Sequence, residues 1–324
     1  MKVLLLLVLV SVSYGLVSGA VGLVTPVFTP VHEDNTVNYD LIPVYAEYLA
    51  RNNLTTLLVG GSTGEAMALS MADRKGVLDA WLQASKTHGL TIIYQTIGAS
   101  YPDVLELARY SAKAGVSTLI VAADMGYRPR SAEELVGYLQ RVAEQALGLT
   151  LGYYHEPRIT HVKVDMREFV QKATERIPNF KIVKYSAESL DEAVAINGIL
   201  HDDQELYYAY TPLLAPAVIM GIPSIASPSF SLFPALAQRV LAAGRRGDGA
   251  AARAAQLQLD AAVEAVTGYH NDAYLQAMKQ GMGLVSSIQL GPALLPQPPR
   301  SEADRQAAAD NLRRLGYYNN YTLQ

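Results

Sequence analysis

The sequence predicts an α/β fold, a parallel (β/α)8 (TIM) barrel with a C-terminal helical appendage. Short β-rich runs alternate with longer amphipathic runs, which is typical of repeated βα units around a parallel sheet. About eight such β-rich runs follow residue 20, and eight parallel strands close a barrel. A doubly wound open sheet is the competing architecture, but no GxGxxG opens the first βα unit and the spacing continues through all the repeats.

The expected strands are short, apolar and rich in β-branched or aromatic residues. They are GLVTPVFT from Gly22, TLLVG from Thr56, TIIYQTI from Thr91, TLIVA from Thr118, LGYY from Leu151, KIVK from Lys181, LYYAY from Leu206 and IPSIAS from Ile222. Helices are expected between them, for example over 39–50, 70–86 and 131–146. The last of these opens with a capping box formed by Ser131 and Glu134.

The pattern changes after the eighth strand, so we expect a barrel over 21–231 and a helical region over 232–324. From Leu232 the chain reads as nearly continuous helix, ending in a surface helix near 301–315. Apolar residues recur at helix-face spacing in the alanine-rich middle, which favours a packed appendage over a disordered tail. These residues are Leu257, Leu259, Ala262, Val263 and Val266.

Composition excludes several classes of function. Half of the 324 residues are apolar and the net charge is -4, with no basic stripe of the kind that binds nucleic acid or anionic membranes. The chain has no cysteine, and its six histidines form no HExxH or paired spacing. Metal ligands in their usual patterns are therefore lacking, and no cofactor is expected.

The first twenty residues read as a secretory signal peptide. Lys2 precedes a strongly apolar run, and Ser18 and Ala20 stand at the minus-three and minus-one positions of a cleavage site. An uncleaved membrane anchor or a buried helix is the alternative, but the apolar run is shorter than the roughly twenty residues of a membrane span. We therefore expect a secreted protein, with sequons for N-glycosylation at Asn53 and Asn320.

Candidate catalytic groups stand at the carboxyl ends of the expected strands, where parallel barrels place their active sites. Lys184 ends the apolar run FKIVK, and Tyr153 and Tyr154 end the preceding strand about thirty residues upstream. Neighbouring strands would bring these side chains within reach of one pocket. Lys184 could attack a ketone to form an imine, while Tyr154 could transfer protons and hold the substrate carboxylate. The alternative to a catalytic site is a structural one, in which the tyrosines only pack in the barrel and Lys184 extends its amine to solvent.

The loop after the second strand, GGSTGEA, has the composition of an anion site. Its glycines, Gly61 among them, would let backbone amides approach a carboxylate, and Ser62 and Thr63 add hydroxyl donors. An ordinary glycine-rich turn is the alternative, but the loop's position at the functional face of the barrel favours binding.

Four segments, VTPVFTP, GGSTGEAMALS, GYYHEP and FKIVKYS, occur in an order and spacing that resemble the N-acetylneuraminate lyase and dihydrodipicolinate synthase family. The resemblance covers nearly everything after the leader. The sequence around Tyr154 and Ser186 is most similar to that of the animal-type sialate lyases. It implies a barrel with a C-terminal helical appendage, a class I aldolase that forms a pyruvate imine without a cofactor, and a homotetramer. An aldehyde or amino sugar would be the second substrate.

By the same resemblance, Lys184 matches the imine lysine and Tyr154 the tyrosine of the family's YxxP motif. Ser62 and Thr63 match the loop that binds the pyruvate carboxylate. Tyr127, after the fourth strand, loosely matches a tyrosine that reaches into a neighbouring subunit's site. His155, beside Tyr154, is expected on the opposite face of its strand as a packing residue.

Two strand ends depart from the pattern of the sialate lyases. After the seventh strand, Ala209, Thr211 and Pro212 stand where the lyases have a glycine and two acids that bind the sugar's hydroxyl groups. The eighth keeps Ser227 but places Ala226 and Pro228 beside it.

The charges of Glu156 and Arg158 are also unusual; they could pair, face solvent or contact a different substrate. Three functions stay open: an N-acetylneuraminate lyase, the same imine chemistry with another aldehyde, and a secreted noncatalytic barrel used for binding or structure.

Overall fold

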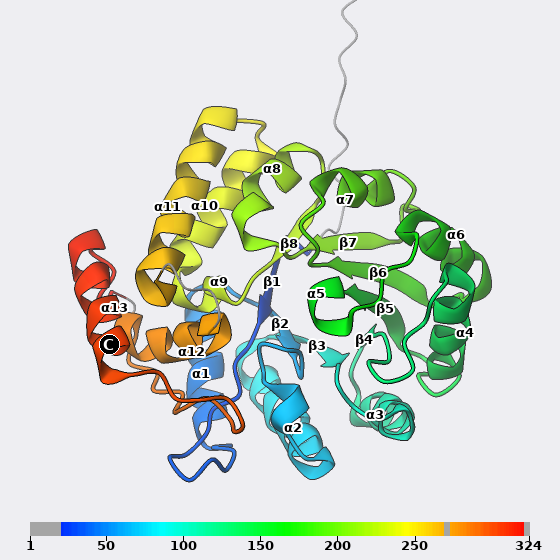
Figure 1. The fold of residues 1–324 in the computed structure, drawn as a ribbon, viewed down its shortest axis with the longest axis horizontal. Helices are drawn as coiled ribbons and strands as arrows, with labels where there is room; N and C mark the ends of the chain where they lie inside the picture. Colours follow the sequence, from blue (N-terminus) through cyan, green and yellow to red (C-terminus); the bar gives the residue numbers. More distant parts are fainter. Residues whose placement is uncertain (1–20, 269–272, 321–324) are drawn as a thin grey trace, which may run out of the picture.

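Eight parallel strands close into a barrel in the order of the chain, as the sequence predicts. The computed structural model describes residues 21–268 and 273–320 (Figure 1), so the expected leader lies outside the described residues. The strands are β1 (Leu23–Pro26), β2 (Thr56–Val59), β3 (Thr91–Thr96), β4 (Thr118–Ala122), β5 (Thr150–His155), β6 (Phe180–Tyr185), β7 (Glu205–Tyr208) and β8 (Ser224–Ala226). The expected strands all exist, and β7 stops at Tyr208 because Thr211 and Pro212 begin a 3-10 turn, η2 (Thr211–Leu213).

Helices between the strands form the outer layer of the barrel (Figure 1). They are α1 (Leu41–Arg51), η1 (Ala66–Ala68), α2 (Met71–His88), α3 (Tyr101–Ala114), α4 (Ala132–Ala143), α5 (Pro157–Thr160), α6 (Met166–Arg176), α7 (Leu190–Asn197) and α8 (Leu214–Ile219). The helix start predicted at Ser131 is confirmed, since its hydroxyl accepts from the Glu134 amide at 3.2 Å. The Glu134 carboxylate, however, accepts from the Arg130 amide, one residue before the cap.

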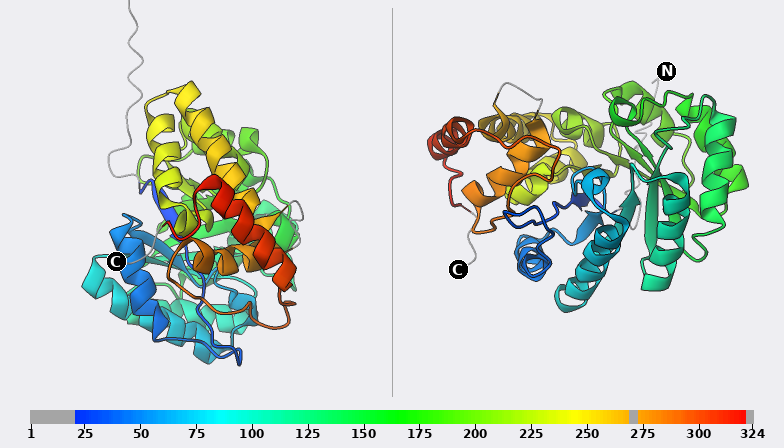
Figure 2. Two further views of the ribbon diagram at one scale, coloured as in Figure 1. Left: turned by 90° about the vertical axis from the view of Figure 1, so that its left-hand side faces the viewer. Right: turned by 60° about the horizontal axis from the view of Figure 1, so that its bottom comes forward.

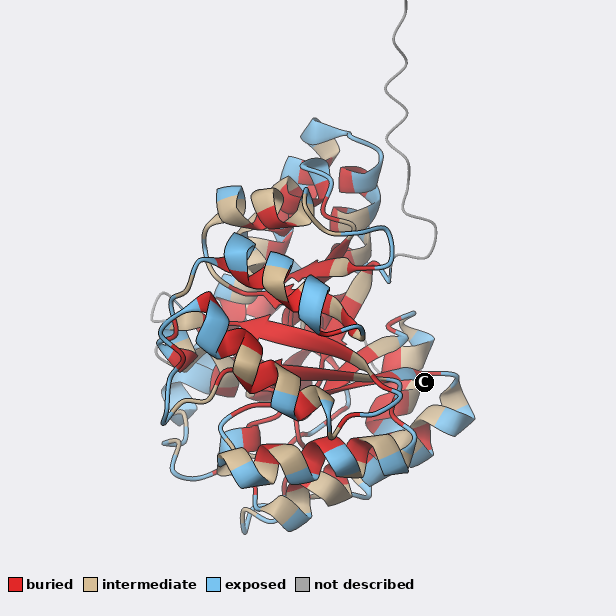
Figure 3. Ribbon diagram, turned by 90° about the vertical axis from the view of Figure 1, so that its right-hand side faces the viewer, coloured by how far each residue is buried: buried red, intermediate tan, exposed pale blue. Residues whose placement is uncertain are grey.

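The apolar core has two parts, because strand side chains alternate between the two faces of the sheet. A small cluster fills the barrel and includes Leu58, Ile93, Ile120 and Ile182. A much larger cluster lies between the strands and the surrounding helices. Figure 3 shows the result: the strands are buried, while the helices alternate between buried and exposed faces.

The C-terminal helices lie together on one flank of the barrel (Figure 2). They are α9 (Ser229–Leu232), α10 (Pro234–Arg245), α11 (Gly249–Thr267), α12 (Tyr274–Val285) and α13 (Glu302–Leu315). Helix α10 packs on α8 and touches β1, so it covers the barrel, whereas α11 joins α10 to α12 and α13. The division of the chain at 231/232 stays a prediction.

The prediction of the buried face of α11 is wrong for one residue. Leu257 is 57% exposed, while Leu259, Ala262 and Val266 are buried. The buried stripe runs back through Ala255 and Ala252 instead, which keeps the three- and four-residue spacing of a helix face.

A carboxylate ties the first described residues to the amino-terminal end of the barrel. The Val21 amide donates to Glu205 Oε1 at 3.1 Å, and the Ser224 hydroxyl donates to the same oxygen. The Gly22 amide in turn donates to Ser224 Oγ at 2.7 Å. Burial raises the pKa of Glu205.

Within the described ranges, no helix is long and apolar enough to cross a membrane.

Candidate active site

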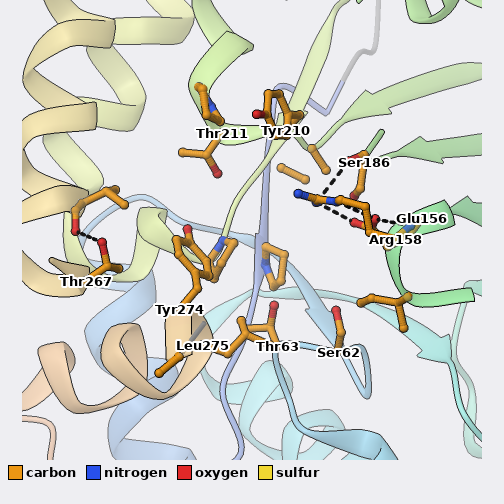
Figure 4. A pocket seen from close by; sticks show the side chains of 18 of the residues that line it. Ser62, Thr63, Glu156, Arg158, Ser186, Tyr210, Thr211, Thr267, Tyr274 and Leu275 are labelled. Carbon is orange, nitrogen blue, oxygen red and sulfur yellow. Dashed lines mark hydrogen bonds and ion pairs between the residues drawn. The ribbon is translucent and has the colours of Figure 1, made fainter. Parts of the chain in front are cut away.

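A cavity of about 890 Å³ opens at the carboxyl ends of the strands, within the size range of ligand pockets. Its lining brings together six of the residues predicted from the sequence: Ser62, Thr63, Tyr154, Lys184, Ser186 and Thr211. Figure 4 labels four of them, Ser62, Thr63, Ser186 and Thr211. Gly61 and Ser227 are neighbours of these residues but are not part of the lining. The cavity is therefore the place where the predicted chemistry can occur.

Lys184 lies in the middle of a row of aligned strand residues. On β6 it is in register with Tyr154 of β5 and Tyr207 of β7, and only 4% of it is exposed. Its Nζ stands 3.9 Å from the centroid of the Tyr154 ring. Burial lowers the pKa of Lys184 to about 7, and the negative charge of Glu156 only partly opposes the shift. A sizeable fraction of the amine is therefore neutral, and nucleophilic, at neutral pH.

Tyr154 shares the interior of the barrel with this lysine. Burial, together with the charge of Glu156, raises the pKa of Tyr154 to about 12, while hydrogen bonds with Ser186 and Ser62 act in the opposite direction. The phenol therefore keeps its proton at neutral pH. A protonated phenol beside a neutral amine is a donor placed for a carbonyl oxygen that the amine attacks.

Tyr153 does not reach the cavity, contrary to the expectation that both tyrosines would. It points outward and packs on Phe169 of α6, with 4.9 Å between ring centroids. His155 faces the same way, as predicted, with its ring 5.2 Å from that of Tyr185. The difference follows from strand alternation, which puts adjacent residues on opposite faces. Burial lowers the pKa of His155 to about 4, so it stays neutral.

The loop that carries Ser62 and Thr63 needs a glycine at its start. Gly60 has φ +78°, and a Cβ there would stand 2.8 Å from the Gln95 carbonyl oxygen, so only glycine fits this tight exit from β2. Thr29 fixes the other end of the loop, because its hydroxyl donates to the Gly64 carbonyl at 2.6 Å.

A buried ion pair anchors the same loop to the C-terminal helices. Glu65 has φ +55°, and its carboxylate accepts from Lys279 Nζ at 2.6 Å, the Leu294 amide at 2.6 Å and Gln297 Nε2 at 2.7 Å. Lys279 and Glu65 are both almost fully buried. Because each of the two buried charges has the other as its partner, this cluster fixes the loop against α12 and leaves neither charge unpaired.

Gln95 is a site residue that the sequence interpretation missed. It lies inside the barrel on β3 with no exposed surface, and its Oε1 accepts from Lys184 Nζ at 2.9 Å. Strand alternation could have found it, because a glutamine between Ile93 and Ile97 in an apolar strand has to face the barrel interior.

The open end of the cavity is built by segments outside the barrel strands. Thr211 occupies the place where acids were expected in the sialate lyases, and its hydroxyl is 2.9 Å from that of Ser227. Tyr274 of α12 lies nearby (Figure 4). Asp260, another residue that the sequence interpretation missed, lines the cavity from α11 and accepts from Gln256 Nε2 at 2.8 Å. Burial raises the pKa of Asp260.

Glu156 and Arg158 pair with each other, which was one of the three possibilities left open. Arg158 Nε donates to Glu156 Oε1 at 3.0 Å and its Nη2 donates to Oε2 at 2.9 Å (Figure 4). The guanidinium also stands 5.5 Å from the Tyr210 ring. Glu156 is almost fully buried, whereas Arg158 is half exposed at the rim of the cavity. A bidentate ion pair of this kind is stronger than an ion pair with a single hydrogen bond on the surface.

Tyr127 lies apart from the cavity, on the loop after β4, and is 93% exposed. Its side chain therefore takes no part in the site of its own chain. In the described part of the chain, no three His, Cys, Asp or Glu side chains gather as metal ligands would.

Residues 20–314 match the model of the dihydrodipicolinate synthetase family. N-acetylneuraminate lyase of Gallus gallus is 30% identical over 285 residues, which are 87% of this chain and 91% of that protein. The enzyme of the same name from Danio rerio is 27% identical over 294 residues, 90% of this chain and 95% of that protein.

A solved structure confirms the fold at lower sequence identity. Proteus mirabilis N-acetylneuraminate lyase superposes with a TM-score of 0.85 at 24% identity, over 91% of this chain and 98% of that one. The family match and the similar lyases carry the assignment beyond the fold: the chain belongs to the dihydrodipicolinate synthetase family and is a class I aldolase, a carbon–carbon lyase.

Proposed function

We propose that this aldolase forms its imine between Lys184 Nζ and the C2 carbonyl of pyruvate or of a larger 2-keto acid. The observation that carries the proposal is the buried Nζ, 3.9 Å from the Tyr154 ring at the closed end of the cavity. A lysine whose pKa falls to about 7 through burial is a nucleophile at neutral pH without any cofactor.

In the cleavage direction, Nζ adds to C2 and the carbinolamine loses water to give a protonated imine. Tyr154 supplies the proton for the carbonyl oxygen as it becomes a hydroxyl, and the carboxylate lies on the amides and hydroxyls of Ser62 and Thr63. The C3–C4 bond then breaks, its electron pair enters the imine to give an enamine, and the phenolate that Tyr154 became in the first step takes the C4 hydroxyl proton as the aldehyde leaves. Protonation at C3 and hydrolysis return pyruvate and the free lysine.

The first test is reduction of this intermediate. The purified protein is incubated with pyruvate and borohydride, and the peptide that contains Lys184 is examined by mass spectrometry for the reduced adduct. An adduct at this lysine is expected. A folded protein that gives no adduct at neutral to mildly alkaline pH would favour a noncatalytic barrel used for binding or structure.

We infer that N-acetylneuraminate is the first substrate to test, because similar proteins carry the name N-acetylneuraminate lyase. A different aldehyde partner is the second candidate. It is favoured by the open end of the cavity, where Thr211 and Ser227 hydrogen-bond to each other and no acid follows β7 to bind a sugar's hydroxyl groups. Release of pyruvate from sialic acid and from shorter 2-keto sugar acids separates the two candidates.

Export and assembly are also proposals. Secretion rests on residues 1–20, and glycosylation on Asn53, which is exposed between α1 and β2, and Asn320, which is also exposed. A homotetramer is proposed from the family resemblance, with the exposed Tyr127 reaching a neighbouring subunit. Amino-terminal sequencing, deglycosylation and the mass of the native assembly test these three points.

A further inference from the structure

The interior of the barrel contains one amide that packing does not explain. Gln95 has no exposed surface and stands among apolar side chains such as Ile93, Ile120 and Ile182. Its Nε2 has no hydrogen-bond partner among the described residues. Buried polar groups are normally paired, so a half-paired amide at the centre of a barrel calls for a functional reason.

The paired half of this amide is in contact with the reacting nitrogen. Gln95 Oε1 accepts from Lys184 Nζ at 2.9 Å, and the ring face of Tyr154 lies 3.9 Å from the same atom. The two contacts occupy two directions around Nζ. In a neutral amine, they engage the two N–H groups and leave the lone pair for an electrophile in the cavity.

The amide also lies beneath the loop proposed to bind the carboxylate. A Cβ built on Gly61 would stand 3.2 Å from both Cδ and Nε2 of Gln95. The absent side chain of Gly61 therefore makes room for the amide between the loop and the lysine. One neutral side chain thus touches both parts of the proposed pyruvate site.

We infer that Gln95 is a positioning residue for imine formation, which orients Lys184 Nζ towards the keto carbon without adding a charge beside it. The inference rests on the proposed imine at Lys184. Neutrality matters because a carboxylate at the same distance would stabilise the ammonium form and remove the nucleophile. The protonated imine keeps one N–H, which the same oxygen can accept.

The groups around Nζ come from β3, β5 and β7 and from the segment after β5. Tyr154 faces it from β5, Tyr207 stands in register on β7, and Glu156 acts through its charge. Glu156 is paired with Arg158, so Gln95 is the contact of Nζ at which a conservative substitution most directly introduces a charge.

The test compares Gln95→Leu and Gln95→Glu with wild type and with Gln204→Leu. Gln204 is also buried, but its Nε2 donates to Thr174 and to the Phe180 carbonyl, away from Lys184. Folding of each variant is checked by circular dichroism and thermal unfolding. Two rates are measured across pH 5.5–9.5 with cyanoborohydride as the hydride donor, because borohydride decomposes in acid. They are trapping of pyruvate at Lys184 and reductive methylation of Lys184 by formaldehyde, which requires no pyruvate site.

In wild type both rates should rise with pH around a midpoint near 7, the pKa of the buried amine. Gln95→Leu should lower the plateau rate of trapping about tenfold, because the amine is no longer oriented. Gln95→Glu should move the midpoint upward by about one unit or more and recover the rate at high pH. Gln204→Leu should leave midpoint and plateau unchanged.

The inference is overturned if folded Gln95→Leu and Gln95→Glu both match Gln204→Leu in midpoint and plateau for methylation and trapping. If one Gln95 variant fails to fold, the other decides alone. If wild type is methylated at Lys184 but never traps pyruvate, the proposed function fails; a midpoint shift in Gln95→Glu would then still establish the contact.

Discussion

The two ends of the cavity are built in different ways. At the closed end, Tyr154 and Lys184 stand on adjacent strands in register, with Gln95 beside them on β3. At the open end, Thr211 and Asp260 come from a 3-10 turn and from α11, and Arg158 from the short helix α5. Strands fix side chains more firmly than connecting segments do. We therefore expect the reaction at the closed end and selection of the aldehyde at the open end.

The largest effect is expected at the closed end, from Lys184→Met. This variant should lose pyruvate trapping completely, because no other group replaces the nucleophile. The matched control is Lys181→Met on the same strand, whose amine pairs with Asp203 at 2.6 Å on the surface and should not matter for trapping. Full trapping in Lys184→Met would remove the closed end as the reaction centre.

The stability of Lys184→Met relative to wild type should depend on pH. The pKa of Lys184 falls from 10.5 unfolded to about 7 folded, so between these values the unfolded chain binds more protons. Wild-type stability therefore decreases as pH falls through this window. The advantage of Lys184→Met over wild type should grow from pH 10 to pH 7 and level off below, which denaturant titrations at several pH values would measure.

The next largest effect is expected from Tyr154→Phe. Loss of the phenol should lower the trapping rate about 100-fold, within the range of general acid catalysis. Tyr153→Phe is the control, because the buried Tyr153 hydroxyl has no partner in the described structure and faces α6. Equal rates for the two variants would contradict the assignment of opposite roles to adjacent tyrosines.

At the open end, Asp260→Asn should act on the aldehyde and not on pyruvate. We expect the trapping rate to stay at the wild-type level and kcat/KM for cleavage of a polyhydroxylated substrate to fall about tenfold, the size of one lost hydrogen bond to a charged group. Asp310→Asn, on the surface of α13, is the control. A matching loss in both reactions would show that the two ends do not work separately.

The smallest effect is expected from Glu156→Gln. The charge of Glu156 raises the pKa of Lys184, so its removal should move the midpoint of trapping to lower pH, by about half a unit. Glu188→Gln is the control, because Glu188 is exposed and stands 3.9 Å from the same arginine. An upward shift would mean that Glu156 acts through Arg158 instead.

The sequence predicted the closed end far better than the open end. Strand alternation and chain order suffice to place Lys184 and Tyr154 together, because neighbouring parallel strands repeat one geometry. Taking Tyr153 into the pocket ignored that same alternation, and Gln95 was missed although it obeys it. Asp260 could not be placed from local patterns, because its position depends on how α11 packs on α8 and α10.

The contact between Val21 and Glu205 bears on the leader cleavage that we propose after Ala20. If cleavage follows Ala20, the Val21 nitrogen, 3.1 Å from Glu205 Oε1, becomes an ammonium and the partly buried carboxylate gains a counter-ion. Maturation would then complete the base of the barrel. The mature chain should be more stable at pH 7 than its amino-terminally acetylated form, and Glu205→Gln should abolish that difference; equal stabilities in the native sequence would contradict the pairing.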